Sequence, residues 1–382
     1  MSYRPLADVR KDLRVEWYRC PIEGSKLREL SRRSDLQGWF QAGGHLSLFV
    51  LTGAITYVFW LQQMWVGVVI GLYFHGTVGS FLRGVASHEL VHGSVFRTKF
   101  LNKFFLYFFG LLGWFDSFDY ASSHTYHHRY TLHPEGDREV LLPLKPTVGK
   151  TFLLQICTIN LWTQKGRTFG RAGGLFPTII GTFRSAISTP GSPDTSKSEW
   201  WNALNYDQPD QYRRSLWWSR AQLAYHATVW VVSILTGQWI WIFLISVFPF
   251  IANLASYLVS MPQHCGLRDN VPDFRKCVRS NTLIPILEFL YWRMNWHLEH
   301  HMYAGVPCYN LKKLYHEVAH DMPQPRTLRS AWREMLDTWE RQQTDPDYQY
   351  DTPLPATAQR IREDEADALE SSIGDLAPKG LK

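Results

Sequence analysis

The sequence of 382 residues has little cysteine and no large surplus of either charge. Its five cysteines form no CxxC pair, so we expect reduced thiols and neither a fused iron–sulfur domain nor a disulfide framework. A glycine-rich dinucleotide fingerprint is also missing, which argues against a fused redox domain. The formal net charge of only +6 excludes a nucleic-acid binder that depends on bulk charge.

Two long stretches contain no Lys, Arg, Asp or Glu: 38 residues from His45 to Leu82, and 44 residues from Ala221 to His264. A membrane span needs about 20 apolar residues, so each stretch predicts two spans, with turns at residues 61–64 and 236–238. All 40 Lys and Arg residues lie outside these stretches, which by the positive-inside rule predicts that both termini are cytoplasmic. The 17 Trp and 18 Tyr residues are typical of membrane interfaces.

The predicted organisation has six segments. The apolar stretch 100–115 is too short to span a membrane, and we expect an interfacial helix there. Residues 343–382 hold more acids than bases, which predicts a solvated, disordered tail. The segments are a cytoplasmic N-terminal segment (1–44), transmembrane hairpin 1 (45–82), a cytoplasmic cap (83–220), transmembrane hairpin 2 (221–259), a second part of the cap (260–342) and the tail (343–382).

Eight of the fifteen histidines fall into three clusters next to membrane segments. Positions i, i+3 and i+4 share one face of a helix, so each cluster directs its imidazoles the same way. Eight imidazoles exceed the four ligands of one zinc ion, and the pattern therefore predicts two metal ions, with iron, zinc, copper and nickel all open. The clusters are HELVH (His88, His92), HTYHH (His124, His127, His128) and HLEHH (His297, His300, His301).

Six of the other seven histidines are predicted to lie outside the metal site. HELVH matches the zinc-protease pattern HExxH, but so does HEVAH at residues 316–320, which we interpret as a solvated pair, His316 and His320. His75 and His226 fall within predicted spans, where we expect neutral imidazoles bonded to neighbouring helices. His45 is also left out, as is His133, although it follows the second cluster closely.

With these three clusters in this order, the sequence resembles the membrane fatty-acid desaturase and alkane hydroxylase superfamily over roughly residues 40–330. Flanking residues add to the resemblance, among them Asn295-Trp296, Val306-Pro307 and Asp137. It implies an all-α integral membrane fold, in which four transmembrane helices in two hairpins support a cytoplasmic helical cap with a di-metal site. His264, in MPQHCG, occupies the place of a further family ligand.

The resemblance also implies the chemistry. Two Fe²⁺ ions would use O₂ and electrons from an external donor to oxidise an unactivated C–H bond of a fatty-acyl or related lipid chain, with desaturation as the expected reaction. Hydroxylation or oxidative decarboxylation by the same site stays open. Glu89 could orient a cluster histidine or relay protons, and Asp137 could accept a hydrogen bond from a ligand. The run 116–123 departs from the family pattern and leaves the substrate class open.

An apolar substrate would arrive from the bilayer. Electrons would come from a separate carrier, such as a ferredoxin, a rubredoxin or a b-type cytochrome with its reductase. Two other classes of protein remain as alternatives. A membrane zinc hydrolase using HELVH with Glu89 as base would leave the other two clusters unexplained. A histidine-rich receptor or metal transporter would be expected to place its ligands near the membrane midplane.

Overall fold

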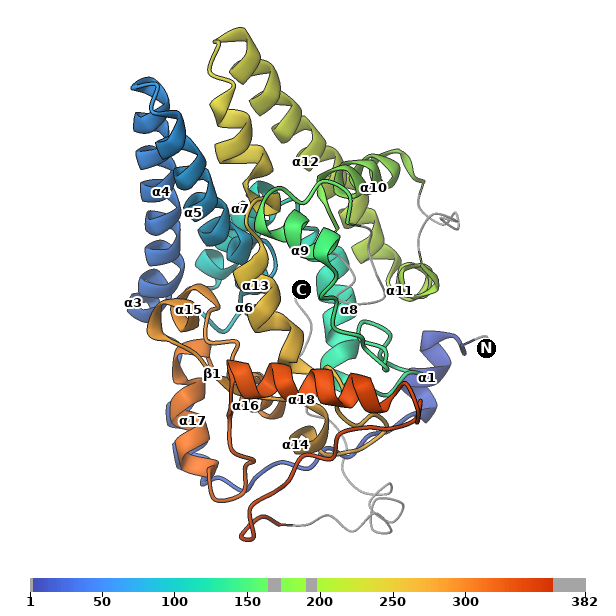
Figure 1. Cartoon of the computed structure of the whole chain (residues 1–382). Helices are drawn as coiled ribbons and strands as arrows, with labels where there is room; N and C mark the ends of the chain where they lie inside the picture. Colours follow the sequence, from blue (N-terminus) through green and yellow to red (C-terminus); the bar gives the residue numbers. More distant parts are fainter. Residues whose placement is uncertain (1–2, 164–172, 190–197, 360–382) are drawn as a thin grey trace.

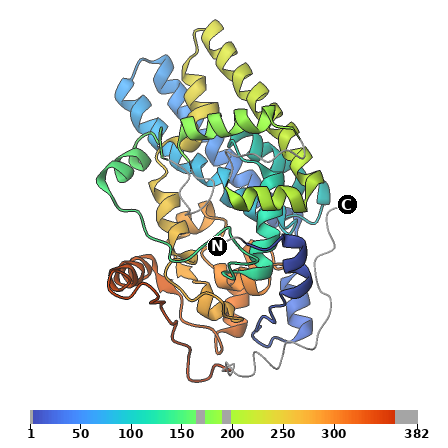
Figure 2. The ribbon, with the colours of Figure 1, turned by 90° about the vertical axis from the view of Figure 1, so that its right-hand side faces the viewer.

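The computed structural model describes residues 3–163, 173–189 and 198–359, and in these ranges the chain is mainly helical. Two hairpins project from the same side of a helical body, which we call the base (Figure 1). A view turned by 90° shows the same arrangement (Figure 2). The N-terminal segment crosses the base through α1 (Leu6–Asp12) and α2 (Gly24–Leu30) before α3 (Asp35–Gly38) and a π-helical turn, Trp39–Gly43, lead into the first hairpin.

The first hairpin consists of α4 (Gly44–Leu61) and α5 (Trp65–Arg83). The turn between them lies where the sequence predicts it, and Gln63 there adopts a positive φ of 58°. Counted with the turns that extend them, the two helical runs cover Asp35–Leu61 and Trp65–Val91, each 27 residues, and both are long and apolar enough to cross a membrane. At 1.5 Å per residue each run is about 40 Å long, more than the hydrocarbon core of a bilayer.

Large apolar side chains are exposed along the first hairpin. Val66, Val69 and Phe74 on α5 are exposed by 75%, 68% and 59%, and Val50 and Leu51 on α4 by more than half. A contiguous apolar surface of this kind is unusual on a protein surrounded by water. The first hairpin is therefore suited to contact with lipid.

The second hairpin pairs the upper part of α12 (Pro209–Leu235) with a return limb of short helical turns. The limb contains a π-helix (Ile242–Val247), a 3₁₀ turn (Phe248–Phe250), α13 (Leu254–Ser260) and a second 3₁₀ turn (Met261–Gln263). Within the described ranges, only the two runs of the first hairpin meet the length and hydropathy expected of a span. The second pair of spans therefore stays a prediction.

The return limb breaks at Pro249, because proline has no N–H to continue a helix. A neighbouring extended segment satisfies the freed backbone: the Asn160 N–H donates to Phe250 O at 2.7 Å, and the Ala252 N–H donates to Thr158 O at 2.8 Å. The break is thus covered by protein, which pairs its freed backbone groups.

The other helices build the base and its edge. They are α6 (Val85–Val91), α7 (Lys99–Leu112), α8 (Ser117–Tyr130), α9 (Lys150–Cys157), α10 (Leu175–Ile187), α11 (Glu199–Asp207), α14 (Phe274–Cys277), α15 (Pro285–Leu290), α16 (His297–Met302), α17 (Leu311–Val318) and α18 (Leu328–Arg341), with a 3₁₀ turn at Cys308–Asn310. The short strands β1 (Asn281–Thr282) and β2 (Arg326–Thr327) pair in parallel, Asn281 opposite Arg326. The helix expected near 100–115 is present as α7.

The prediction of a disordered tail is wrong for residues 343–359, because these residues lie against the base. The Tyr350 N–H donates to Gly266 O at 2.8 Å, and Lys276 Nζ donates to Thr352 O at 2.8 Å. Asp351 also pairs with Lys276 at 2.8 Å. The sequence predicts that the acidic residues of the tail are solvated, but this one holds the segment against the base. Residues 360–382 lie outside the described part of the chain.

A buried ion network ties distant segments of the base together. The Arg275 guanidinium is fully buried and contacts Asp273 at 2.9 Å and Asp321 at 2.7 Å. Tyr18 donates to the other oxygen of Asp321 at 2.5 Å, and Arg275 also donates to Gln359 O at 2.8 Å. The N-terminal segment, α14 and the C-terminal segment therefore share one buried cation.

Removing this cation tests the network. We expect Arg275→Ala to lower the free energy of unfolding by about 3–5 kcal/mol, because two carboxylates would stay buried without their partner. The exposed pair of Arg213 with Asp210 is the matched control, and Arg213→Ala should leave stability unchanged. Unfolding in detergent measures both variants, and equal stability would contradict the role given to Arg275.

Candidate metal centre

Three helices and one turn of the base carry the nine candidate ligands. His88 lies on α6 and His92 immediately follows it, so the first cluster sits at the end of the membrane-capable run Trp65–Val91. α8 carries the second cluster and is capped at its N-terminus by Asp116, whose side chain accepts from two backbone N–H groups of the first turn. α16 carries the third cluster, and His264 follows the 3₁₀ turn Met261–Gln263.

The structure brings all nine predicted histidines together in two adjacent groups. In each group the potential ligand atoms lie within 4.8 Å of one another. His92 and His128 are partly buried, and the other seven histidines are buried. The first His group is His88, His92, His124, His128 and His300, and the second His group is His127, His264, His297 and His301.

Within each group the imidazoles meet through their Nε2 atoms. In the first group, His124 Nε2 lies 3.1 Å from His92 Nε2 and 3.0 Å from His128 Nε2, and His300 Nε2 lies 3.2 Å from His128 Nε2. In the second group, His297 Nε2 lies 3.0 Å from His264 Nε2 and 3.1 Å from His301 Nε2.

Hydrogen bonds between the rings cannot account for these contacts. An imidazole nitrogen has either one hydrogen or one lone pair in the ring plane, yet His124 Nε2 and His297 Nε2 each face two other nitrogens. A shared cation can account for them, since two nitrogens bound at right angles at about 2.1 Å lie about 3.0 Å apart. His88 Nε2 is buried without a hydrogen-bond partner and is a further free ligand atom. Each His group therefore fits a metal ion.

The outward Nδ1 atoms of several ligands are held by other groups. Such contacts fix the tautomer and leave Nε2 free for metal. The pairs are His127 with Asp137 Oδ2 at 2.8 Å, His301 with Thr131 Oγ1 at 3.1 Å, His264 with Cys277 O at 3.0 Å, His124 with Tyr120 OH at 3.2 Å and His88 with Glu89 Oε1 at 3.1 Å.

Burial keeps most of these imidazoles in the neutral, metal-binding form. It lowers the pKa of His264 to about 3. Burial and the neighbouring histidines also hold the pKa well below the ordinary value at further positions, among them His128, His297, His300 and His301.

His127 is the exception. Burial alone would lower its pKa, but the Asp137 carboxylate outweighs burial and raises it. The same contact, with the backbone N–H groups of Leu132 and Glu139, lowers the pKa of Asp137 despite its full burial. Asp137 is thus an ionised acceptor that can hold the Nδ1–H of His127.

Two buried glutamates lie beside the ligands. Glu89 has no exposed surface; its Oε1 lies 3.1 Å from His88 Nδ1 and 3.6 Å from His300 Nδ1, and its Oε2 has no hydrogen-bond partner. Glu299, inside the third cluster, accepts from Ser280 Oγ at 2.5 Å. Burial raises the pKa of Glu299 to about 7, against the lowering effect of the Ser280 hydroxyl. Both glutamates belong to the histidine clusters, so a change of charge in the site would change the protonation of their carboxyl groups.

Sequence reasoning missed four contributors to the site. Thr131 follows His127 by four residues and Tyr120 precedes His124 by four, so helical spacing could have indicated both. Glu139 lies 3.8 Å from His124 Nδ1 and was overlooked beside Asp137. The carbonyl of Cys277 carried no signal, because a backbone contact across 13 residues depends on the fold.

The histidines predicted to lie outside the site do lie outside it. His75 contacts Thr52 Oγ1 at 3.0 Å and Leu244 O at 2.9 Å. His226 contacts Leu111 O at 3.0 Å and Ser246 Oγ at 2.8 Å. Both therefore join helices, as expected.

Two more histidines have partners elsewhere, and the last two are exposed. His45 contacts Val78 O and accepts from Trp292 Nε1, and His133 contacts Thr131 O. His316 and His320, the second HExxH match, are exposed. The solvated pair expected there is confirmed.

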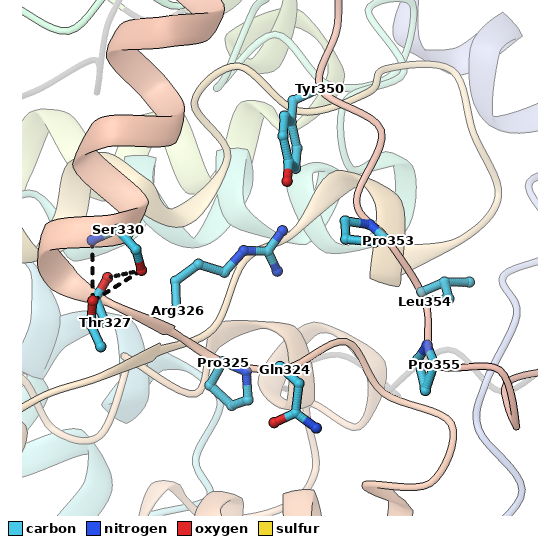
Figure 3. A pocket seen from close by; sticks show the side chains of 9 residues that line it. All are labelled: Gln324, Pro325, Arg326, Thr327, Ser330, Tyr350, Pro353, Leu354 and Pro355. Atoms are coloured by element: carbon cyan, nitrogen blue, oxygen red, sulfur yellow. Dashed lines mark hydrogen bonds between the residues drawn. The ribbon is translucent and has the colours of Figure 1, made fainter.

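A surface groove lies between the start of α18 and the C-terminal segment (Figure 3). Arg326, Ser330, Tyr350 and Pro353 are among its lining residues, and none of the nine histidines lines it. The groove therefore has no part in the metal site.

The arrangement defines a class: a helical protein with membrane-capable helices above two histidine groups, each able to hold a metal ion. A family model described as fatty acid desaturase matches residues 59–332, a range that contains all nine histidines of the two His groups. The chain belongs to the fatty acid desaturase family. No curated protein matches it.

Weakening a ligand's support tests the site without removing the ligand. We expect Asp137→Asn to weaken metal binding by about 10–100-fold, because an amide keeps a hydrogen-bond acceptor near His127 but loses the charge. Competition with a chelator measures this affinity. His316→Ala is the control and should bind as the wild type does. Unchanged affinity in Asp137→Asn would show that the carboxylate does not support a ligand.

Proposed function

We propose that this protein is a membrane-bound oxidase that uses two non-haem iron ions and O₂ to desaturate a fatty-acyl or related lipid chain. One observation carries the proposal: nine buried or partly buried imidazoles gather into two adjacent groups at the end of a membrane-capable helix, in a member of the fatty acid desaturase family.

Iron is the metal that this donor set and the family favour. Nine nitrogen ligands divided into five and four exceed what one tetrahedral zinc ion takes. Imidazole suits iron, and high coordination numbers agree with nitrogens spaced 3.0–3.2 Å apart. Bound there with O₂ and two external electrons, two iron ions would supply the oxidising power needed to remove hydrogen from an unactivated C–H bond.

The protein's own residues position and insulate this chemistry. Asp137 holds His127 through an ionised hydrogen bond, while Thr131 and the Cys277 carbonyl orient His301 and His264. Burial excludes water from the ligands, which protects reactive species from side reactions. Glu89, with one carboxylate oxygen unpartnered, is placed to accept or deliver a proton beside His88 and His300.

The position of the site suits an apolar substrate. His88 and His92 lie at the end of the run Trp65–Val91, so a chain leaving the bilayer would travel only a short distance to the metals. Charged residues are absent from 45–82, and the apolar surface of α4 and α5 can meet acyl chains directly. A fatty-acyl or hydrocarbon substrate follows from this placement.

The proposed topology has four spans. The first hairpin crosses and returns, α12 and its return limb do the same, and the base lies in the cytoplasm with both termini. Trp60 packs edge-on against Trp65 and Trp239, with ring centroids 5.3 Å and 4.2 Å apart, so the tips of the two hairpins meet in an aromatic cluster. Tryptophans at one depth are typical of a membrane interface, here the one away from the base. In this topology α7 lies at the opposite interface.

Electrons would arrive from a separate carrier of the ferredoxin, rubredoxin or b-type cytochrome kind. Basic side chains are exposed on the helical base and offer complementary charge to an acidic carrier; they include Lys312, Lys313, Arg329 and Arg333. A zinc hydrolase is not favoured, because Glu89 is enclosed among ligands from two clusters instead of facing an open metal site.

The reaction can be read from its product. Cells that express the iron-loaded protein and receive a perdeuterated saturated fatty acid should form lipid chains that have lost two deuterium atoms, detected by mass spectrometry. His300→Ala removes a ligand and should abolish the product. A product that has gained one oxygen atom would show hydroxylation in place of desaturation. A product that has lost one carbon atom would show decarboxylation. No oxidised product from iron-loaded protein would contradict the oxidase.

Topology can be tested by labelling in intact cells. Gln62, at the tip of the first hairpin, and Ser330, on α18, are both exposed. In a Cys157→Ser background, a membrane-impermeant maleimide should label Gln62→Cys from outside and Ser330→Cys only after permeabilisation. The reverse pattern would overturn the cytoplasmic placement of the base.

A further inference from the structure

α10 carries an exposed apolar stripe that the other described residues leave uncovered. Phe176, Ile180, Phe183 and Ile187 recur at i, i+4, i+7 and i+11 and are exposed by 38%, 44%, 53% and 67%. This spacing places them on one face of the helix. Trp162 is exposed by 61% and stacks on Phe176 with ring centroids 4.6 Å apart, so it extends the stripe beyond the helix.

A different face of α10 packs against the protein. Leu175, Thr178 and Ala186 are buried, α10 runs against α12, and Arg220 of α12 donates to Ala186 O at 2.8 Å (Figure 1). The exposed Arg184 lies about 100° around the helix from Phe183. The helix therefore has three sides: a core side, an apolar side and a basic side.

The contacts of α10 fix its depth relative to the hairpins. Arg83, the first charged residue after the charge-free stretch 45–82, donates to Thr178 Oγ1 at 3.1 Å. The charge-free stretch is the part of the chain suited to the bilayer core, so its end marks the membrane boundary. Thr178 lies at that boundary, and α10 with it.

A second set of bonds joins α10 to the return limb. The segment 158–161 pairs with the break in the return limb at Phe250 and Ala252, and it continues into α10 through Leu175 N–H to Asn160 O at 2.8 Å. α10 is thus held both by the base-side end of α5 and by the break in the return limb.

We propose that the stripe formed by Trp162, Phe176, Ile180, Phe183 and Ile187 inserts into the bilayer leaflet at the base side. The proposal rests on the membrane topology given under the proposed function. An interfacial helix lies in the membrane plane with its apolar face buried about 5–10 Å into the headgroup and acyl boundary. Arg184, beside the stripe, can reach the headgroup phosphates.

A bilayer fits this surface better than another protein does, because the stripe lies at the depth where the exposed apolar surface of the first hairpin ends. The stripe spans 12 residues, about 17 Å of helix, and needs no partner other than the lipid already around the hairpins. A second copy of the chain, or another protein, is the competing occupant.

Spin labels on the full-length protein in phosphatidylcholine nanodiscs test the proposal. In a Cys157→Ser background, one label is placed at Phe183→Cys on the stripe and one at Arg184→Cys as a control on the same helix. A third, at Val69→Cys on α5, reports on the span itself. Collision with oxygen, which concentrates in the membrane, is compared with collision with a water-soluble nickel chelate.

The expected result is a preference for oxygen at Phe183 and Val69 and a preference for the chelate at Arg184. A preference for the chelate at Phe183 with oxygen retained at Val69 would overturn the lipid contact alone. Shielding of Phe183 from both reagents would also overturn it, in favour of a protein partner. A preference for the chelate at Val69 would overturn the membrane topology and the proposed lipid contact with it.

Discussion

The structure depends on a single constraint, which is the close approach of imidazole nitrogens inside a closed site. His124 Nε2 and His297 Nε2 each face two other Nε2 atoms at 3.0–3.1 Å, more partners than one ring nitrogen can satisfy by hydrogen bonding. A cation bound in each group would satisfy these nitrogens together. α6, α8 and α16 are arranged so that their histidine faces meet at this point.

Charge and packing around the site follow from the same requirement. Two divalent ions would bring positive charge into a buried volume, and the carboxyl groups of Asp137 and Glu89 lie beside His127 and His88, close enough to offset it. The Arg275 network also helps to hold these supporting groups in place. It anchors α14, and α14 presents the Cys277 carbonyl to His264. Ligands, supporting groups and the buried ion network form one connected structure.

The sequence predicts well which histidines come together and predicts poorly how distant segments are connected. Helical spacing is enough to find eight histidines, because i, i+3 and i+4 positions share a face, and the family resemblance adds His264. The charge-free stretches predict the first hairpin, whose turn falls at residues 62–64. Pro249, which breaks the return limb, is visible in the sequence, but the pairing of Phe250 and Ala252 with residues 158–160 that covers the break is not, because it depends on the fold. The docking of residues 343–359 is hidden for the same reason, because Lys276 and Gly266 are distant in the chain.

The central claim is that the two His groups hold two iron ions in different environments. Mössbauer spectroscopy of protein loaded with iron-57 tests it directly, together with the metal content per chain. Five ligands in one group and four in the other predict two quadrupole doublets of equal area from about two irons per chain. A single doublet from one iron, or zinc bound with no iron, would contradict the claim.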